Sequence, residues 1–203
     1  MLKRIVTIQD VSCFGKCSST VALPLISAMG VETAVIPTAV LSTHTGGFTG
    51  YTFRDLTADI PQIAAHWKTL QLHFDGIYTG YLGSREQVQI MADFFDAFRS
   101  EDTVIVVDPV MGDAGSYYAA YREHVPEPMH GTGDIFASVL SGALVRGASI
   151  EQALSIAVNF TADTIQATLP DLRTLPREEA LWYGVEFEAC TGNLVDYVKE
   201  IHS

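Results

Sequence analysis

Short apolar runs alternate along the chain with longer segments in which apolar residues recur every three or four positions. The short runs are rich in β-branched residues and predict strands at residues 4–9, 32–37, 76–79 and 103–107. The longer segments predict helices at residues 18–29, 60–70, 84–98, 135–146, 149–168 and 193–201. Because strands and helices alternate, we expect an α/β fold with helices packed on both faces of a central, mostly parallel sheet.

The run at residues 103–107 lacks the polar alternation of a strand that has one face in water. Strands that are buried on both faces of a parallel sheet have this continuous apolar pattern, so we expect helices on both sides of this strand. In such sheets ligands bind beyond the carboxyl ends of the strands. The polar residues that follow the predicted strands are therefore the first candidates for a site.

Several polar residues come directly after predicted strands. Asp10, Tyr81 and Asp108 each follow one strand, and the polar, glycine-rich segment 42–50 follows another. Each residue has a purely structural explanation, as a helix cap, as packing at a rim or as the end of a strand. Because all of them follow strands at one edge of the sheet, we expect them to line a single crevice.

The most specific candidate is residues 130–134, His-Gly-Thr-Gly-Asp, at the start of a predicted helix. Glycines permit the close approach of an anion, and the first N–H groups and the positive dipole end of the helix favour a phosphoryl group. We expect the same dipole to keep Asp134 ionised at neutral pH, so that it can accept a hydroxyl proton. A glycine-rich turn with an acidic helix cap is the alternative.

Composition and charge exclude several classes of partner. The 203 residues predict a single domain, residues 1–203. Charged residues make up only 18%, and the net charge is −12. An acidic chain is a poor partner for nucleic acid or for an anionic membrane. If the protein binds an anion, it must do so locally, through backbone amides or a metal ion.

The cysteines and the N-terminal sequence predict a cytoplasmic protein. Cys13, Cys17 and Cys190 do not form a zinc framework, and three cysteines in a chain of this length suit a reducing compartment. The chain enters a strand pattern at once, without the apolar region and cleavage site of a signal peptide. No apolar run reaches the length that spans a membrane.

Five motifs occur in order along nearly the whole chain. They are Ile8-Gln9-Asp10-Val11-Ser12-Cys13-Phe14-Gly15-Lys16, Ser42-Thr43-His44-Thr45-Gly46, Thr79-Gly80-Tyr81, Asp108-Pro109-Val110-Met111-Gly112-Asp113 and Gly131-Thr132-Gly133-Asp134. Together they resemble the motifs of pyridoxal/pyridoxamine kinases, in the ribokinase-like superfamily. The last motif indicates the superfamily, and the second and third favour its vitamin B6 branch.

The resemblance implies a ribokinase-like three-layer α/β/α fold and transfer of the γ-phosphate of ATP to the 5′-hydroxymethyl group of a B6 vitamer. It also implies Mg²⁺, often with a monovalent cation such as K⁺ or Na⁺, and a homodimer. Asp134 resembles the catalytic base, and Gly131, Thr132 and Gly133 resemble the anion hole around the transferred phosphoryl group. This is not a P-loop enzyme, because no Gly-x-x-x-x-Gly-Lys-Ser/Thr motif is present.

The remaining site residues divide between the metal and the vitamer. Asp113 resembles the residue near the phosphates and their metal, and the resemblance makes Asp108 a candidate for the cation environment; both offer the oxygen ligands that Mg²⁺ prefers. The residues implied for the vitamer pocket are Asp10, His44, Thr45 and Tyr81. Many relatives carry Ser at the position of Asp10. A carboxylate there would accept a hydrogen bond from the phenol or pair with a protonated ring nitrogen or amine, which favours pyridoxine or pyridoxamine over pyridoxal.

The chain departs from the family pattern between Tyr121 and Arg122. Relatives carry there a further stretch with more sheet, an Asn-x-x-Glu motif and part of the nucleotide site, and no Asn-x-x-Glu occurs in this sequence. Either the sequence joins two parts of a longer chain, or the deletion is real. We favour the first explanation, because a deletion would remove central strands from a fold whose other motifs are intact.

Two other functions remain open on the sequence alone. A kinase for hydroxymethylpyrimidine, or for a small sugar or nucleoside, would share the phosphate machinery and differ on the substrate side. A protein that binds a vitamer without catalysis would result if the deletion has abolished the use of ATP.

Overall fold

The computed structural model describes residues 2–108, 112–113, 116–117, 129–176 and 178–202 of the chain. The expected break between Tyr121 and Arg122 lies outside the described residues. Of the Asp108–Asp113 motif, the structure describes the first residue and the backbone of the last two.

A five-stranded sheet forms the centre of the fold, in the order β3-β2-β1-β4-β5. The strands are β1 (Arg4–Ser12), β2 (Glu32–Leu41), β3 (Phe53–Asp55), β4 (Gly76–Thr79) and β5 (Val104–Val107). All neighbours pair in parallel except β3, which is antiparallel to β2. A separate two-stranded ladder joins β6 (Gly112–Asp113) to β7 (Ser116–Tyr117). The expected mostly parallel sheet is confirmed.

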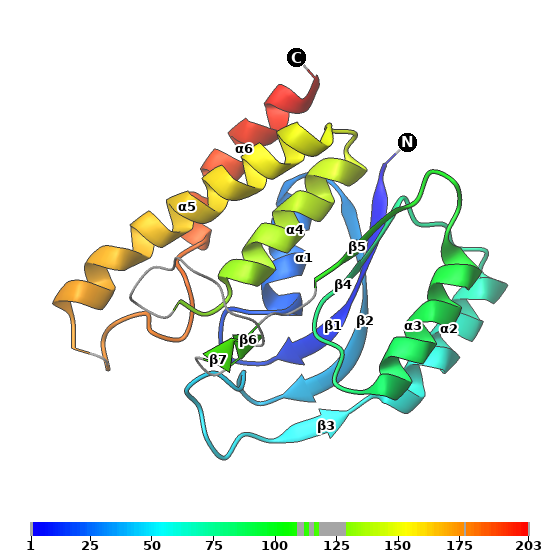
Figure 1. The fold of residues 1–203 in the computed structure, drawn as a ribbon, viewed down its shortest axis with the longest axis horizontal. Helices are drawn as coiled ribbons and strands as arrows, with labels where there is room; N and C mark the ends of the chain where they lie inside the picture. The colour runs from blue at the N-terminus through cyan, green and yellow to red at the C-terminus, as the bar shows by residue number, and fades with distance from the viewer. Residues whose placement is uncertain (1, 109–111, 114–115, 118–128, 177, 203) are drawn as a thin grey trace.

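Helices cover both faces of this sheet (Figure 1). They are α1 (Ser19–Ala28), α2 (Ile60–Thr69), α3 (Arg85–Phe98), α4 (Thr132–Val145), α5 (Ile150–Thr174) and α6 (Thr191–Lys199). Single 3-10 turns occur at η1 (Thr57–Asp59), η2 (Glu188–Cys190) and η3 (Glu200–His202). Among the residues described, no helix combines the length and the apolar character needed to cross a lipid bilayer.

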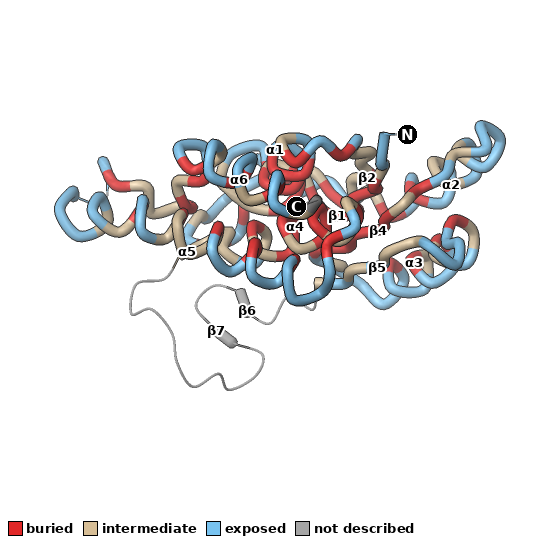
Figure 2. The backbone as a smooth tube through the Cα atoms, turned by 90° about the horizontal axis from the view of Figure 1, so that it is seen from above, coloured by how far each residue is buried: buried red, intermediate tan, exposed pale blue. Residues whose placement is uncertain are grey.

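The alternation of side chains along β1 separates two apolar clusters. Val6 and Ile8 pack with α2 and α3, whereas Ile5 packs with α1 and α4. All three side chains are at most 1% exposed. A third cluster joins α1 and α4 to α5 and α6, so that buried residues concentrate in the middle of the molecule when it is seen from above (Figure 2). In this three-layer arrangement, α4 is held between the sheet and α5.

Local sequence signals set several helix boundaries. Ser84 caps α3 by accepting a hydrogen bond from the Gln87 N–H at 3.1 Å. Ser149 and Gln152 form a reciprocal capping box at the start of α5. These boundaries agree with the expected helices, whereas α5 continues to Thr174, beyond the expected end.

The expectation that helices cover both faces of β5 is wrong for one face. Val104 and Val106 pack on the cluster beneath α1 and α4. Ile105 and Val107, on the opposite face, are 38% and 55% exposed. β5 is the edge strand of the described sheet, and within the described ranges no helix covers this part of its outer face. An apolar sequence pattern cannot reveal which neighbours are present.

Alanine substitutions at a buried position of β4 and at an exposed position of β5 should change the free energy of unfolding by different amounts. Ile77 is fully buried among α2 and α3, so we expect Ile77→Ala to lower the free energy of unfolding by about 2–5 kcal/mol. Val107→Ala, on the open face of β5, should cost less than about 0.5 kcal/mol. Urea denaturation measures both. Similar losses for the two variants would mean that the outer face of β5 is covered in solution.

Candidate active site

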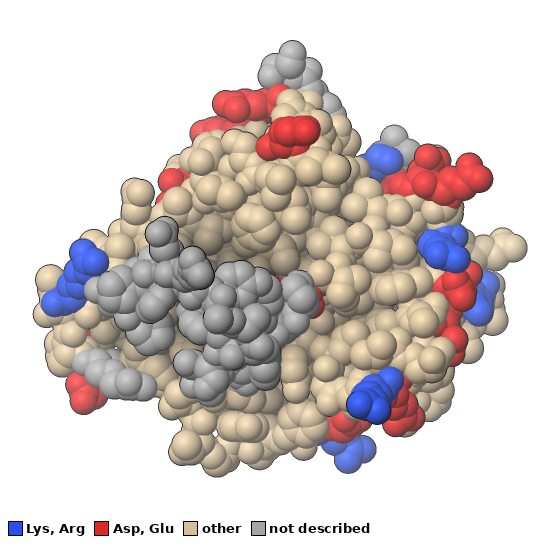
Figure 3. Space-filling model, in the orientation of Figure 1, with Lys and Arg blue, Asp and Glu red and all other residues tan. Residues whose placement is uncertain are grey.

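The carboxyl ends of β1, β4 and β5 and the first turn of α4 meet at one edge of the sheet (Figure 1). Three carboxyl groups from these elements are close enough to interact electrostatically: Asp10, Asp108 and Asp134. On the face drawn in Figure 3, most charged side chains of the described residues lie around the edge of the molecule. The structure thus brings together candidates that lie more than 100 positions apart in the sequence.

The two glycines at the start of α4 have different surroundings. Gly131 is the residue before the helix, with a left-handed φ of 85°. A Cβ atom there would lie 2.1 Å from the carbonyl oxygen of Lys16, so only glycine fits. A Cβ at Gly133 would meet no heavy atom of the described residues within 4 Å. Gly131 therefore brings two loops into contact, and Gly133 borders open space at the positive end of α4.

Asp134 lies in the first turn of α4, with its carboxyl group surrounded by protein. Burial raises its pKa to about 7. The backbone of Ser18 lowers this pKa, and the charges of Asp108 and Asp10 raise it further. The expectation that the helix dipole keeps Asp134 fully ionised at neutral pH is therefore wrong. A carboxyl group with a pKa near neutrality can still act as a general base, because it exchanges protons readily at that pH.

Asp10 is almost fully buried, and both of its carboxylate oxygens accept hydrogen bonds. The hydroxyl of Ser18 donates to Oδ1 at 2.6 Å, and the hydroxyl of Ser12 donates to Oδ2 at 2.9 Å. Nothing in the sequence singles out these two serines, because their role depends on the turn that folds the β1–α1 loop back onto β1.

His44 is also buried, and both of its ring nitrogens are engaged. The Gly46 N–H donates to Nδ1 at 3.0 Å, so Nδ1 carries no proton. Nε2 is 2.9 Å from the carbonyl oxygen of Tyr183, which makes Nε2 the protonated donor. The ring lies 5.2 Å from the ring of His130, which places the 42–50 loop beside the start of α4.

Aromatic side chains from three separate loops gather next to His44. Phe48 lies 5.0 Å from the ring of His44 and 4.7 Å from that of Trp182, and Phe14 lies 4.9 Å from Tyr183. The separation of these residues in the sequence gives no signal of this cluster. It links the 42–50 loop and the β1–α1 loop to the segment after α5.

The other expected residues occupy the outer part of the same edge. Tyr81 is 48% exposed, and Thr45 is exposed on the 42–50 loop. Asp108 is half-buried, and its charge also acts on the buried hydroxyl of Tyr78, whose pKa burial raises well above the ordinary value. For Asp113 only the backbone position in β6 is described. Within the described residues, no group of three or more His, Cys, Asp or Glu side chains is arranged to hold a metal ion.

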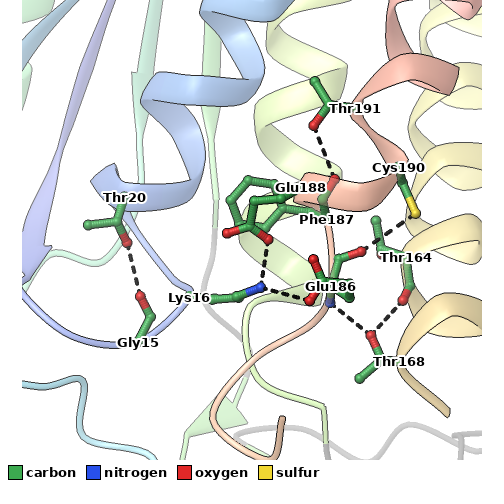
Figure 4. A network of polar contacts seen from close by, with 10 residues as sticks. All are labelled: Gly15, Lys16, Thr20, Thr164, Thr168, Glu186, Phe187, Glu188, Cys190 and Thr191. Carbon is green, nitrogen blue, oxygen red and sulfur yellow. Dashed lines mark hydrogen bonds and ion pairs between the residues drawn. The ribbon is translucent and has the colours of Figure 1, made fainter. Parts of the chain in front are cut away.

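Lys16 ties the β1–α1 loop to the C-terminal part of the chain (Figure 4). Its Nζ lies 2.6 Å from Glu188 and 3.5 Å from Glu186, and 5.4 Å from the centre of the Phe187 ring. Glu186 is held in turn through its N–H, which donates to the Thr168 hydroxyl of α5 at 2.8 Å. These contacts hold the β1–α1 loop in place, and the Lys16 carbonyl oxygen of this loop lies against Gly131.

Comparisons with known proteins agree with this geometry. No family model matches the chain. It is 26% identical over 196 residues to the pyridoxine/pyridoxal/pyridoxamine kinase of Bordetella pertussis, covering 88% of this chain and 62% of that protein. The kinase of the same name from Bordetella avium is 29% identical over 122 residues, which cover 56% of this chain and 40% of that protein. The chain thus spans less than two thirds of the length of these curated relatives.

Solved structures superpose over nearly the whole chain. A protein of Bacteroides thetaiotaomicron, assigned as a phosphomethylpyrimidine kinase and solved with pyridoxal, has a TM-score of 0.81 and 30% identity, with 96% of each chain covered. The pyridoxal kinase of Lactobacillus plantarum has a TM-score of 0.83 at 23% identity and supports the fold alone.

The layered sheet and the carboxylate at the start of α4 define a protein of the ribokinase-like fold. Within that class, the chain is similar to pyridoxine/pyridoxal/pyridoxamine kinases and to the Bacteroides protein that was solved with pyridoxal.

The raised pKa of Asp134 should make stability fall as pH rises. Between about pH 4 and pH 7 the native state holds this proton and the unfolded state does not, so each pH unit costs up to about 1.4 kcal/mol. Asp134→Asn removes this dependence. Its free energy of unfolding relative to wild type should increase from pH 4 to pH 7 and then level off, as measured by urea denaturation. A constant difference would contradict the raised pKa.

Alanine substitutions at Gly131 and Gly133 test two features separately. One is the contact of Gly131 with the β1–α1 loop, and the other is the open space beside Gly133 that we expect an anion to occupy. Gly131→Ala should lower the free energy of unfolding by about 1–2 kcal/mol or more, because of the positive φ and the contact with Lys16. Gly133→Ala should leave stability unchanged or raise it by about 0.5–1 kcal/mol, because alanine suits a helix. If a phosphoryl group occupies the space beside Gly133, this second variant should nevertheless lose activity. Equal destabilisation would contradict the geometry.

Proposed function

We propose that this chain is an ATP-dependent kinase that phosphorylates the 5′-hydroxymethyl group of a vitamin B6 vitamer. The observation that carries the proposal is the position of Asp134 in the first turn of α4, next to Gly133 and with a pKa near neutrality; Gly133 borders space that no described residue fills. Phosphoryl transfer requires alignment of the two oxygens and stabilisation of charge more than covalent help from the protein. A base and an anion site on one helical turn supply both.

In this proposal Asp134 accepts the proton of the substrate hydroxyl group, and the first turn of α4 binds the transferred phosphoryl group. The N–H groups of Gly131, Thr132 and Gly133 form the anion hole, supported by the helix dipole. The chain has a net charge of −12, so local backbone donors are the means by which an anion is attracted here.

The proposed vitamer pocket lies between the 42–50 loop and the segment after β4, with His44, Thr45 and Tyr81 as its lining. Because both nitrogens of His44 are engaged within the protein, His44 would contribute the surface of its ring. Tyr81 is exposed and free to pack on a substituted pyridine. Asp10, the fourth residue expected there, already accepts two hydrogen bonds from the protein.

The donor set suits a magnesium nucleotide. Mg²⁺ in kinases is held by one or two carboxylates together with phosphate and water oxygens, so a larger cluster of protein ligands is not required. We assign Asp108 and Asp113 to this metal, with K⁺ or Na⁺ as an accompanying ion. The Mg²⁺ ion would neutralise negative charge on the phosphates. Solved relatives from Leishmania donovani hold ADP, one of them with pyridoxamine, which supports a nucleotide and a vitamer as the two substrates.

A kinase for a hydroxymethylpyrimidine is the second candidate. It is favoured by the Bacteroides relative, which is assigned as a phosphomethylpyrimidine kinase. That protein was solved with pyridoxal, so its structure supports the vitamer as well. The two activities differ only on the substrate side of the site.

We also propose that the natural chain contains the additional segment expected after Tyr121. The open face of β5 and the shorter length relative to the curated kinases support this proposal. A homodimer in the cytoplasm remains part of the proposed function, and the free thiols of Cys13, Cys17 and Cys190 suit a reducing compartment.

The decisive experiment measures product formation and intact mass on the same preparation, expressed from the native gene. The protein is incubated with ATP and Mg²⁺ and with pyridoxal, pyridoxine, pyridoxamine or hydroxymethylpyrimidine, and phosphorylated product is quantified by mass spectrometry. We expect phosphorylation of at least one B6 vitamer. Asp134→Asn should lower turnover by roughly 10²–10⁴-fold while vitamer binding, measured by calorimetry, is retained.

Each other outcome selects a different conclusion. Turnover of hydroxymethylpyrimidine alone would establish the second candidate. A mass of 22.1 kDa with vitamer binding and no turnover would identify a binding protein without kinase activity. Near-normal turnover of Asp134→Asn would show that Asp134 is not the base.

A further inference from the structure

Gln87 is the third residue of α3, and it takes part in the cap of this helix. Its N–H donates to the Ser84 hydroxyl oxygen, which is the first half of a capping box. At the start of α5, Gln152 has the same position in a complete capping box. The side chain of Gln152 accepts the Ser149 N–H at 3.0 Å, and Gln152 is exposed. The two glutamines can therefore be compared directly.

The side chain of Gln87 bridges two loops from inside the protein. Its Oε1 accepts the N–H of Gly83 at 2.7 Å, and its Nε2 donates to the hydroxyl oxygen of Thr57 at 2.8 Å. Because a backbone N–H can only donate, the atom that faces Gly83 is the oxygen, and the amino group faces Thr57. Gln87 is 3% exposed and Thr57 is 8% exposed, so loss of either hydrogen bond would leave a buried polar group without a partner.

Thr57 is anchored to the strands on either side of the 42–50 loop. The Thr57 N–H donates to Oδ1 of Asp55 at 2.8 Å, and Asp55 lies in β3, which pairs with β2. The N–H of Leu56 donates to the carbonyl oxygen of Thr38 in β2 at 3.0 Å. The 42–50 loop lies in the connection between these two strands. The Thr57 end of the bridge is thus fixed to the strands that carry one side of the proposed vitamer pocket.

The Gly83 end of the bridge lies beside Tyr81, on the other side of that pocket. A Cβ atom at Gly83 would lie 3.5 Å from Cε1 of Tyr81 and 3.9 Å from its hydroxyl oxygen, which are ordinary van der Waals distances. The Tyr81 ring therefore lies next to the backbone that Gln87 holds. Because Tyr81 is 48% exposed, contact with a fixed backbone limits the directions in which its ring can turn.

We propose that Gln87 is a positioning residue for Tyr81: by joining Gly83 to Thr57, its amide sets where the Tyr81 ring stands relative to the 42–50 loop. The assignment of Tyr81 and this loop to a vitamer pocket rests on the proposed function, whereas the hydrogen bonds of Gln87 do not. In the proposed kinase, the bridge sets the width of the space that receives the planar ring of the vitamer.

The bridge is tested in the full chain without any ligand. The variants are Gln87→Met, Thr57→Val, Thr57→Ser and Gln152→Met, each checked for native folding by its amide spectrum. Hydrogen exchange of the Gly83 N–H is followed by NMR. In a second preparation the tyrosines are replaced by 3-fluorotyrosine, and the fluorine-19 signal of Tyr81 is identified by its disappearance in Tyr81→Phe.

Gln87→Met keeps the approximate size of the side chain and loses both hydrogen bonds. We expect the Gly83 N–H to exchange at least about fivefold faster than in wild type, because one hydrogen bond of ordinary strength is lost. The Tyr81 signal should shift in the same variant. Thr57→Val changes only the far end of the bridge, and it should produce both changes to a smaller extent because the Gln87 amide loses its anchor. Thr57→Ser keeps the hydroxyl and should behave as wild type.

Gln152→Met is the matched control, because it removes a glutamine from the same position of another helix cap. We expect it to leave the exchange of the Gly83 N–H and the Tyr81 signal as in wild type. A change in either would mean that a general loss of stability, and not the bridge, determines the two measurements.

The effect on ligand binding is measured with pyridoxine by calorimetry. Gln87→Met should weaken binding at least about threefold, and this loss should disappear when Tyr81 is already replaced by alanine, because Gln87 then has no ring to position. A merely structural role would weaken binding in both backgrounds. In an active chain, Gln87→Met should raise the KM for the vitamer more than the KM for ATP.

The proposal is overturned if Gln87→Met leaves the Gly83 exchange or the Tyr81 signal as in wild type, or if Thr57→Val and Thr57→Ser give the same result. It is also overturned if the loss of affinity persists in Tyr81→Ala. A chain that binds no pyridoxine and phosphorylates no vitamer would refute the proposed function, and the ligand-free spectra would still decide whether Gln87 positions Tyr81.

Discussion

The structure of the site depends on one contact, that between the first turn of α4 and the β1–α1 loop. The Lys16 carbonyl oxygen lies against Gly131, and the backbone of Ser18 lowers the pKa of Asp134. Burying a carboxyl group is unfavourable, and the nearby charges of Asp10 and Asp108 add to the cost. The backbone of Ser18 lowers the pKa of Asp134 and so offsets part of this cost. The balance leaves Asp134 with a pKa near neutrality, which suits proton transfer.

Further contacts hold the β1–α1 loop against other parts of the molecule. The ion pairs of Lys16 with Glu186 and Glu188 connect it to the segment after α5. The aromatic cluster around Phe48 connects it to the 42–50 loop. The proposed phosphate side is therefore built from backbone groups on α4, and the proposed vitamer side from loops that tertiary contacts hold together. This division explains how proteins with different substrates share the fold.

Periodicity predicted most of the fold because β1, β2, β4 and helices α1 to α4 bury one or two faces in a regular pattern. The strand ends in turn placed Asp10, Asp108 and the 42–50 loop at one edge, since parallel strands share their carboxyl ends. Two expectations failed. No helix among the described residues covers the outer face of β5, and Asp134 is not fully ionised at neutral pH. Both depend on what surrounds a residue in space, which a local pattern does not contain.

The sequence by itself determined the layered α/β class, the glycine-rich start of α4 and the acidic residue in its first turn. These follow from the spacing of apolar residues and from the backbone freedom of glycine, which are properties of short segments. Only the tertiary structure decided the pKa of Asp134, the tautomer of His44 and the roles of Ser12 and Ser18. Desolvation, charge and hydrogen bonding act between groups that approach only after folding, so their balance is set by distances that the order of residues does not specify.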